Sequence, residues 1–66
     1  MLVIDARGLK CPWPALRLAR ALREHASGTI EVRADDPNAE RELAAVAAAQ
    51  GLGIVDLGEH RFRVER

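Results

Sequence analysis

Thr29-Ile30-Glu31-Val32-Arg33-Ala34 is the stretch whose pattern restricts the fold most. Apolar and polar side chains alternate strictly, so a strand here places Ile30, Val32 and Ala34 on one face and polar groups on the other. A strand with one polar face belongs to a sheet that is covered on one side only. The pattern therefore argues against a doubly wound fold, in which helices cover both faces.

The residues before this strand predict a β-α unit. The short apolar run Leu2-Val3-Ile4 favours a first strand, which ends at Asp5. Apolar residues then recur at helical spacing from Pro12 onward, through Leu18 and as far as Ala26. Ser27-Gly28 is expected to end this helix, because glycine readily adopts the left-handed conformation.

The residues after the strand predict a second helix and a hairpin. Asp36 can cap a helix that begins at Pro37, and Gly51 is its expected end. Residues 52–57 and 60–65 favour two strands joined at Gly58-Glu59. The order βαβαββ predicts a single α+β domain over residues 1–66, a two-layer sandwich with both helices on one face of a four-stranded mixed sheet. We expect Leu18 and Phe62 in the core, and on the open face Glu31, Arg33, Arg61 and Arg63.

The stretch Gly8-Leu9-Lys10-Cys11-Pro12-Trp13-Pro14 holds the only thiol of the chain. If Pro12 is the first helical residue, Cys11 takes the cap position, where the helix dipole stabilises a thiolate. The neighbouring cations Arg7 and Lys10 would also stabilise the thiolate and so lower the pKa of Cys11. We therefore predict a partly exposed, reactive thiolate; the alternative is a buried structural cysteine. The predicted supporting residues are Arg7, Gly8, which is either a turn former or an ordinary loop glycine, Lys10, Pro12 and Pro14.

Charge is unevenly distributed along a chain of 66 residues with no net charge. Residues 1–27 carry five cations against two carboxylates, a net charge of +3, so an acidic partner or an anionic sulfur species is expected near Cys11. Trp13 is a candidate anchor for a partner protein, with Arg17 and Arg20 as steering charges. The alternatives are a core tryptophan and an ordinary solvated helix face.

Several classes of function are not favoured by composition. Without a secretory leader or a long apolar run, the chain is expected to be soluble and cytoplasmic, with a reduced thiol and no membrane insertion. Direct nucleic-acid binding is not expected, because Trp13 and Phe62 are the only aromatic residues. His25 and His60 do not have metal-ligand spacing, so we assign no metal or cofactor. A Cys-His hydrolytic pair is also rejected, because both histidines are expected far from Cys11.

The chain resembles the TusA-like (SirA-like) sulfur carriers over nearly its whole length. The resemblance rests on Asp5-Ala6-Arg7-Gly8-Leu9-Lys10-Cys11-Pro12-Trp13-Pro14, with its Cys-Pro-x-Pro motif, and on Asp36-Pro37 before the second helix. It implies a βαβαββ two-layer sandwich in which Cys11 carries sulfane sulfur as a persulfide. Glu42 and Ala44 differ from the Asp and Pro that are usual in the members that serve tRNA thiolation.

Two functions follow as hypotheses. The first is a sulfurtransferase-type persulfide carrier without turnover of a small substrate, so whether it counts as an enzyme is partly a convention. The resemblance implies a cysteine desulfurase or rhodanese-like donor and a thiol acceptor protein, in tRNA thiolation, molybdenum-cofactor assembly or sulfur oxidation. The second is a non-catalytic regulatory or binding module that uses the basic face of the first helix.

Overall fold

The strands and helices of the computed structural model, which describes residues 1–25 and 27–66, follow the predicted order. The elements are β1 (Leu2–Asp5), α1 (Trp13–Glu24), β2 (Ile30–Arg33), α2 (Ala39–Ala49), β3 (Gly53–Gly58) and β4 (Arg61–Glu65). Ala26, which we expected within the first helix, lies outside the described residues.

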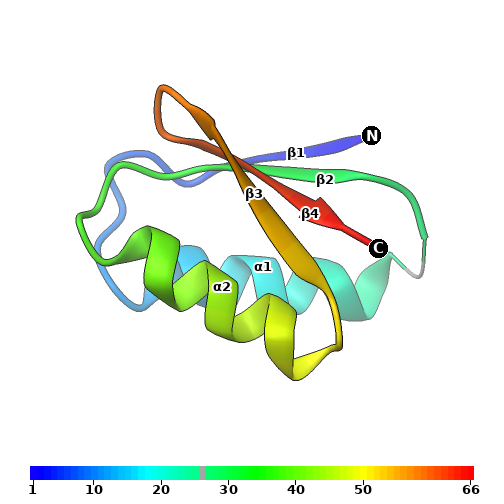
Figure 1. Ribbon diagram of the computed structural model, residues 1–66. Coiled ribbons are helices and arrows are strands. Elements are labelled where there is room, and N and C mark those ends of the chain that lie inside the picture. The colour runs from blue at the N-terminus through cyan, green and yellow to red at the C-terminus, as the bar shows by residue number, and fades with distance from the viewer. Residues whose placement is uncertain (26) are drawn as a thin grey trace.

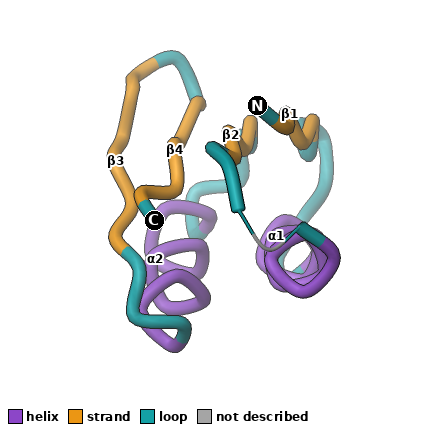
Figure 2. Tube along the Cα trace, turned by 90° about the vertical axis from the view of Figure 1, so that its right-hand side faces the viewer, coloured by secondary structure: helices purple, strands orange, loops and turns teal. Residues whose placement is uncertain are grey.

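The four strands form one mixed sheet in the order β1-β2-β4-β3. β1 and β2 are parallel, whereas β4 is antiparallel to both of its neighbours. Both helices lie against the same face of the sheet (Figure 1), with α1 below β1 and β2 and α2 below β3 and β4 (Figure 2). The predicted α+β two-layer sandwich is therefore confirmed.

The register of the central strands separates the core face from the open face. Ile30 pairs with Val64 and Val32 with Phe62, and all four side chains are buried beneath the helices. Leu18 of α1 is fully buried in the same core, as predicted for Leu18 and Phe62. The alternation of side chains along β2 thus determines which face of the sheet the helices cover.

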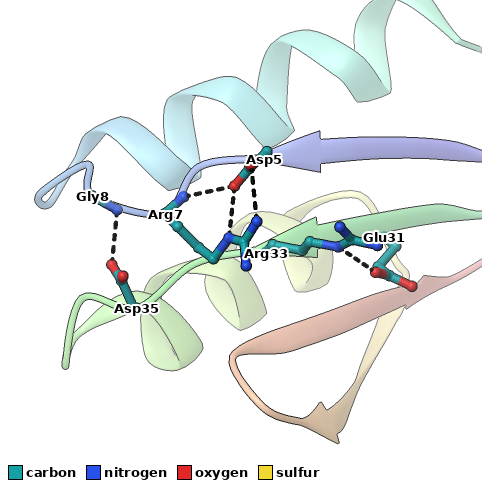
Figure 3. A network of polar contacts seen from close by, with 6 residues as sticks. All are labelled: Asp5, Arg7, Gly8, Glu31, Arg33 and Asp35. Atoms are coloured by element: carbon teal, nitrogen blue, oxygen red, sulfur yellow. Dashed lines mark hydrogen bonds and ion pairs between the residues drawn. The ribbon is translucent and has the colours of Figure 1, made fainter.

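The open face carries the four predicted charged residues, but it is less exposed to water than the alternation suggested. Glu31 pairs with Arg63 across the strands, and Arg33 pairs with Arg61. Glu31 is only 7% exposed, and its Oε2 accepts a hydrogen bond from Arg33 Nε at 2.9 Å (Figure 3). Long arginine stems can cover neighbouring groups while the charged ends stay in water, which explains the burial of a carboxylate on an open face.

Both helices begin later than we predicted from the positions of Pro12 and Pro37. α1 begins at Trp13, because the Trp13 amide donates to the Lys10 carbonyl at 2.9 Å in a turn that precedes the helix. Pro14, not Pro12, therefore lies inside the first helical turn and is fully buried. Likewise α2 begins at Ala39, after a turn in which the Ala39 amide donates to the Asp36 carbonyl. Each predicted start lies inside a turn that leads into the helix.

The hairpin turn between β3 and β4 lies one residue later than expected. Glu59 and His60 both have left-handed backbone conformations, with φ of 55° and 62°. A two-residue turn with positive φ at both positions matches the right-handed twist of the flanking strands. The turn is therefore formed by Glu59-His60 and not by Gly58-Glu59.

Truncation of Leu18 tests the assignment of the core. Leu18→Ala should lower the free energy of unfolding by about 2–5 kcal/mol or abolish cooperative unfolding, because it opens a cavity in a small core. The matched control is Leu16→Ala on the same helix; Leu16 is 51% exposed and should cost no more than about 0.5 kcal/mol. Urea unfolding followed by circular dichroism measures both, and equal losses would contradict the packing described here.

Candidate functional site

Cys11 lies in the loop between β1 and α1, and this loop is tied to the loop between β2 and α2. The Gly8 amide donates to Asp35 Oδ1 at 3.0 Å (Figure 3), and the Cys11 amide donates to Asp36 Oδ2 at 3.3 Å. Gly8 has φ of 83°, so glycine is the residue best suited to this position. The side chain of Cys11 is exposed, as predicted. The two loops thus present the thiol at one edge of the sheet.

The thiol of Cys11 contacts a carboxylate. Cys11 Sγ donates a hydrogen bond to Oε2 of Glu42, which projects from the first turn of α2. The other oxygen of that carboxylate, Oε1, is buried and has no hydrogen-bond partner among the described residues. Glu42, at the start of α2, thus accepts the hydrogen bond of the Cys11 thiol, which lies just before α1.

The pKa of Cys11 is raised, and our prediction of a lowered pKa is wrong. The hydrogen bond to Glu42 is the largest cause, followed by partial removal of the thiol from water and by the negative charges of Glu42 and Asp36. Arg41 acts in the opposite direction and does not outweigh them. The prediction assumed that Cys11 caps the helix, but α1 begins at Trp13, one residue later than predicted, and Pro12 takes the cap position. The thiol therefore remains protonated to higher pH than an ordinary cysteine.

The cations next to Cys11 in sequence do not surround its thiol. Arg7 forms an ion pair with Asp5, with Nε 3.0 Å from Oδ1 and Nη2 3.2 Å from Oδ2 (Figure 3). This pair lowers the pKa of Asp5 and raises that of Arg7. Lys10 and Pro12, the sequence neighbours of Cys11, are exposed, and neither is among the groups that shift the pKa of the thiol.

The structure brings Trp13, Arg17 and Arg20 together along α1. They line a groove of about 530 Å³ between this helix and the edge strand β1, whose Leu2 and Ile4 form part of its floor. Trp13 is 57% exposed, so the alternative of a core tryptophan is excluded. Arg20 pairs with Glu24 one turn further along, with Nε 3.0 Å from Oε2. The groove extends along the helix from Trp13, two residues after Cys11, to His25.

Sequence reasoning missed the carboxylates that surround the thiol. Asp36 and Glu42 lie 25 and 31 residues from Cys11, and only the tertiary fold brings them to it. Two signals were present: the Asp36-Pro37 landmark, and Glu42 as a departure from the tRNA-thiolation members. Within residues 1–25 and 27–66, no cluster of His, Cys, Asp and Glu could hold a metal ion, and no helix could cross a membrane.

Comparisons with known proteins agree on one family. The family model described as sulfurtransferase TusA matches residues 2–66. "Putative sulfur carrier protein YrkI" of Bacillus subtilis is 40% identical over 55 residues, which cover 82% of this chain and 73% of that protein. A "Putative sulfur carrier protein" of Archaeoglobus fulgidus is 37% identical over 54 residues, which cover 80% of this chain and 70% of that protein. The crystal structure of a SirA-like protein from Desulfitobacterium hafniense superposes with a TM-score of 0.77 at 28% identity, covering 97% of this chain and 92% of that one.

Neutralising Glu42 should make the thiol more acidic. In Glu42→Gln the carboxylate charge next to Cys11 is lost, so the pKa of the thiol should fall toward its ordinary value. The rate of alkylation by iodoacetamide, measured as a function of pH, should then rise at lower pH than in the parent protein. Glu40→Gln is the matched control, because Glu40 lies on the same helix turn but is not among the groups that shift this pKa. Identical pH profiles for Glu42→Gln and the parent protein would refute the contact.

Proposed function

Because the chain belongs to the TusA family and has the role of a sulfur carrier, we propose that Cys11 is the residue that carries the sulfur, as a persulfide. The observation that carries this proposal is the exposure of the only cysteine in the chain, in a loop fixed by Asp35 and Asp36. A donor and an acceptor can both reach such a thiol without unfolding the protein.

Loading is a transfer of sulfane sulfur between two thiols. The Cys11 thiolate attacks the terminal sulfur of a donor persulfide, R–S–SH, and a bond forms between Sγ and that sulfur as the donor S–S bond breaks. The electron pair of the broken bond stays on the donor sulfur, which takes up the proton released by Cys11 and becomes a thiol. Cys11 becomes Cys11–S–SH, so it is oxidised while the donor is reduced.

Delivery is the same reaction in reverse order. The thiolate of an acceptor attacks the terminal sulfur of Cys11–S–SH, and Cys11 leaves as a thiolate that regains a proton. No second cysteine is present in the chain to take the sulfur first. The acceptor thiol must therefore come from another molecule, and the partners are a donor protein, such as a cysteine desulfurase or a rhodanese-like protein, and a thiol acceptor protein.

The groove along α1 is the proposed docking surface for these partners. Trp13 offers an exposed apolar anchor beside the thiol, and exposed tryptophan and arginine are enriched where interfaces gain most of their energy. Arg17 and Arg20 line the same groove and can steer an acidic partner surface toward it.

Mass spectrometry tests whether Cys11 carries sulfur. Incubation with a saturating excess of sodium hydropolysulfide should add sulfur to the intact protein, and a reductant should remove it. Cys11→Ser should show no such addition while keeping the circular dichroism spectrum of the parent, since it changes one exposed atom. If the parent protein takes up no sulfur at Cys11, or if Cys11→Ser retains the function of the parent, the regulatory or binding module is the better hypothesis.

Charge reversal tests the docking surface. Arg17→Glu combined with Arg20→Glu should slow sulfur uptake from a cysteine desulfurase supplied with L-cysteine by about tenfold at low salt, because steering between exposed charges is strongest there. Arg23→Glu, compared with Arg17→Glu alone, is the matched control for one charge reversal, since Arg23 is exposed on the same helix but does not line the groove. Equal rates for these two single variants would remove α1 from the docking surface.

A further inference from the structure

We propose that Cys11 is selective for sulfur donors that bring positive charge to the reacting sulfur, such as a protein persulfide beside lysine or arginine. Small anionic sulfur compounds, such as hydropolysulfide or thiosulfate, would react more slowly with it. This inference rests on the proposed function and specifies the class of donor. It also reverses our expectation, from sequence, of an anionic sulfur species near Cys11.

The groups that face the thiol are acidic. Glu42 contacts Sγ directly, and Asp36 accepts the hydrogen bond of the Cys11 amide. Asp35 adds a third carboxylate in the same pair of loops, through its contact with the Gly8 amide. An anionic reagent that approaches Sγ must therefore approach at least two negative charges, whereas a cationic one is attracted by them.

Three of the nearby cations have other partners, and the fourth, Lys10, is exposed and is not among the groups that shift the pKa of Cys11. Arg7 is paired with Asp5, and Arg20 with Glu24. Arg41 donates from Nη2 to the side-chain oxygen of Asn38 at 3.2 Å, and although it acts on the thiol, the pKa of Cys11 is still raised. The balance of charge at Sγ is therefore negative.

Glu42 also has an unused acceptor. Its Oε1 is buried without a hydrogen-bond partner among the described residues, while Oε2 is occupied by the thiol. A buried acceptor that lacks a partner is costly, and rotation of the Glu42 side chain as the donor docks would bring Oε1 to a lysine or arginine of the donor. Binding of such a group would also neutralise the charge that holds the thiol proton, and would favour the thiolate when the donor is in place.

The same surface carries the opposite charge further along α1. At a rise of about 1.5 Å per residue, Arg17 lies roughly 6 Å along α1 from Trp13, its first residue. A donor that fits both regions has basic groups next to its reacting sulfur and acidic groups one to two helical turns away. Such a pattern fixes the orientation in which the donor docks, because the reversed orientation juxtaposes like charges.

Two thiol reagents of opposite charge test this selectivity directly. 2-(Trimethylammonium)ethyl methanethiosulfonate is cationic and 2-sulfonatoethyl methanethiosulfonate is anionic, and both react with the thiolate. The ratio of their rates is therefore independent of the pKa of Cys11 and reports the local charge. At low salt, the ratio for the folded protein should exceed that for the urea-unfolded chain by at least about threefold, which is less than one unit charge at about 4 Å in water would give for two reagents of opposite charge.

Variants assign the effect to Glu42. Glu42→Gln should lower the cation-to-anion ratio by about threefold or more, whereas Glu40→Gln should leave it close to that of the parent. A folded ratio no higher than the unfolded one, or a ratio unchanged by Glu42→Gln, would overturn the inference. If either occurs while hydropolysulfide still loads Cys11, the proposed function stands and only the donor selectivity fails. If Cys11 takes no sulfur from any donor, the proposed function fails whatever the ratio.

Discussion

The parallel pairing of β1 with β2 is the constraint on which the site depends. Carboxyl ends of parallel strands lie at the same edge of a sheet, so the loops that follow β1 and β2 meet there. The amides of Gly8 and Cys11 then donate to the carboxylates of Asp35 and Asp36. The cysteine loop is thus fixed by side chains of the second loop, and α2 begins close enough for Glu42 to reach the thiol.

This arrangement makes the resting thiol less nucleophilic than an ordinary cysteine. The thiolate is the attacking form, and a raised pKa leaves less of it at neutral pH. The sign of the effect on stability follows from linkage. The protonated thiol is favoured by folding, so its contribution to stability is complete below the unfolded pKa of about 8.5 and is lost as pH rises through the folded value. The contact with Glu42 therefore couples protonation of the Cys11 thiol to folding.

The fold was largely predictable from the sequence, because its signals are local. Alternation in residues 29–34 identified the covered face, and helical spacing placed Leu18 in the core. The site was less predictable, because its chemistry arises from long-range contacts. Arg7 adjoins the cysteine loop in sequence but pairs with Asp5, whereas Glu42 is distant in sequence and contacts the thiol. The sequence neighbours of Cys11 therefore predicted a lowered pKa, whereas its contacts in the fold raise that pKa.

A chain of 66 residues has little surface for recognition, and here carboxylates and arginines occupy different parts of it. Carboxylates of the β2–α2 loop and of α2 surround the start of α1, while arginines line the groove further along it. Exposed charges contribute little to stability, so their separation matters mainly for how partners approach. Trp13 lines the same groove as the arginines, two residues after Cys11, and its apolar ring has no charge preference. Apolar burial can therefore supply affinity at the site while the two charged regions set orientation, and a surface this small can bind and still discriminate.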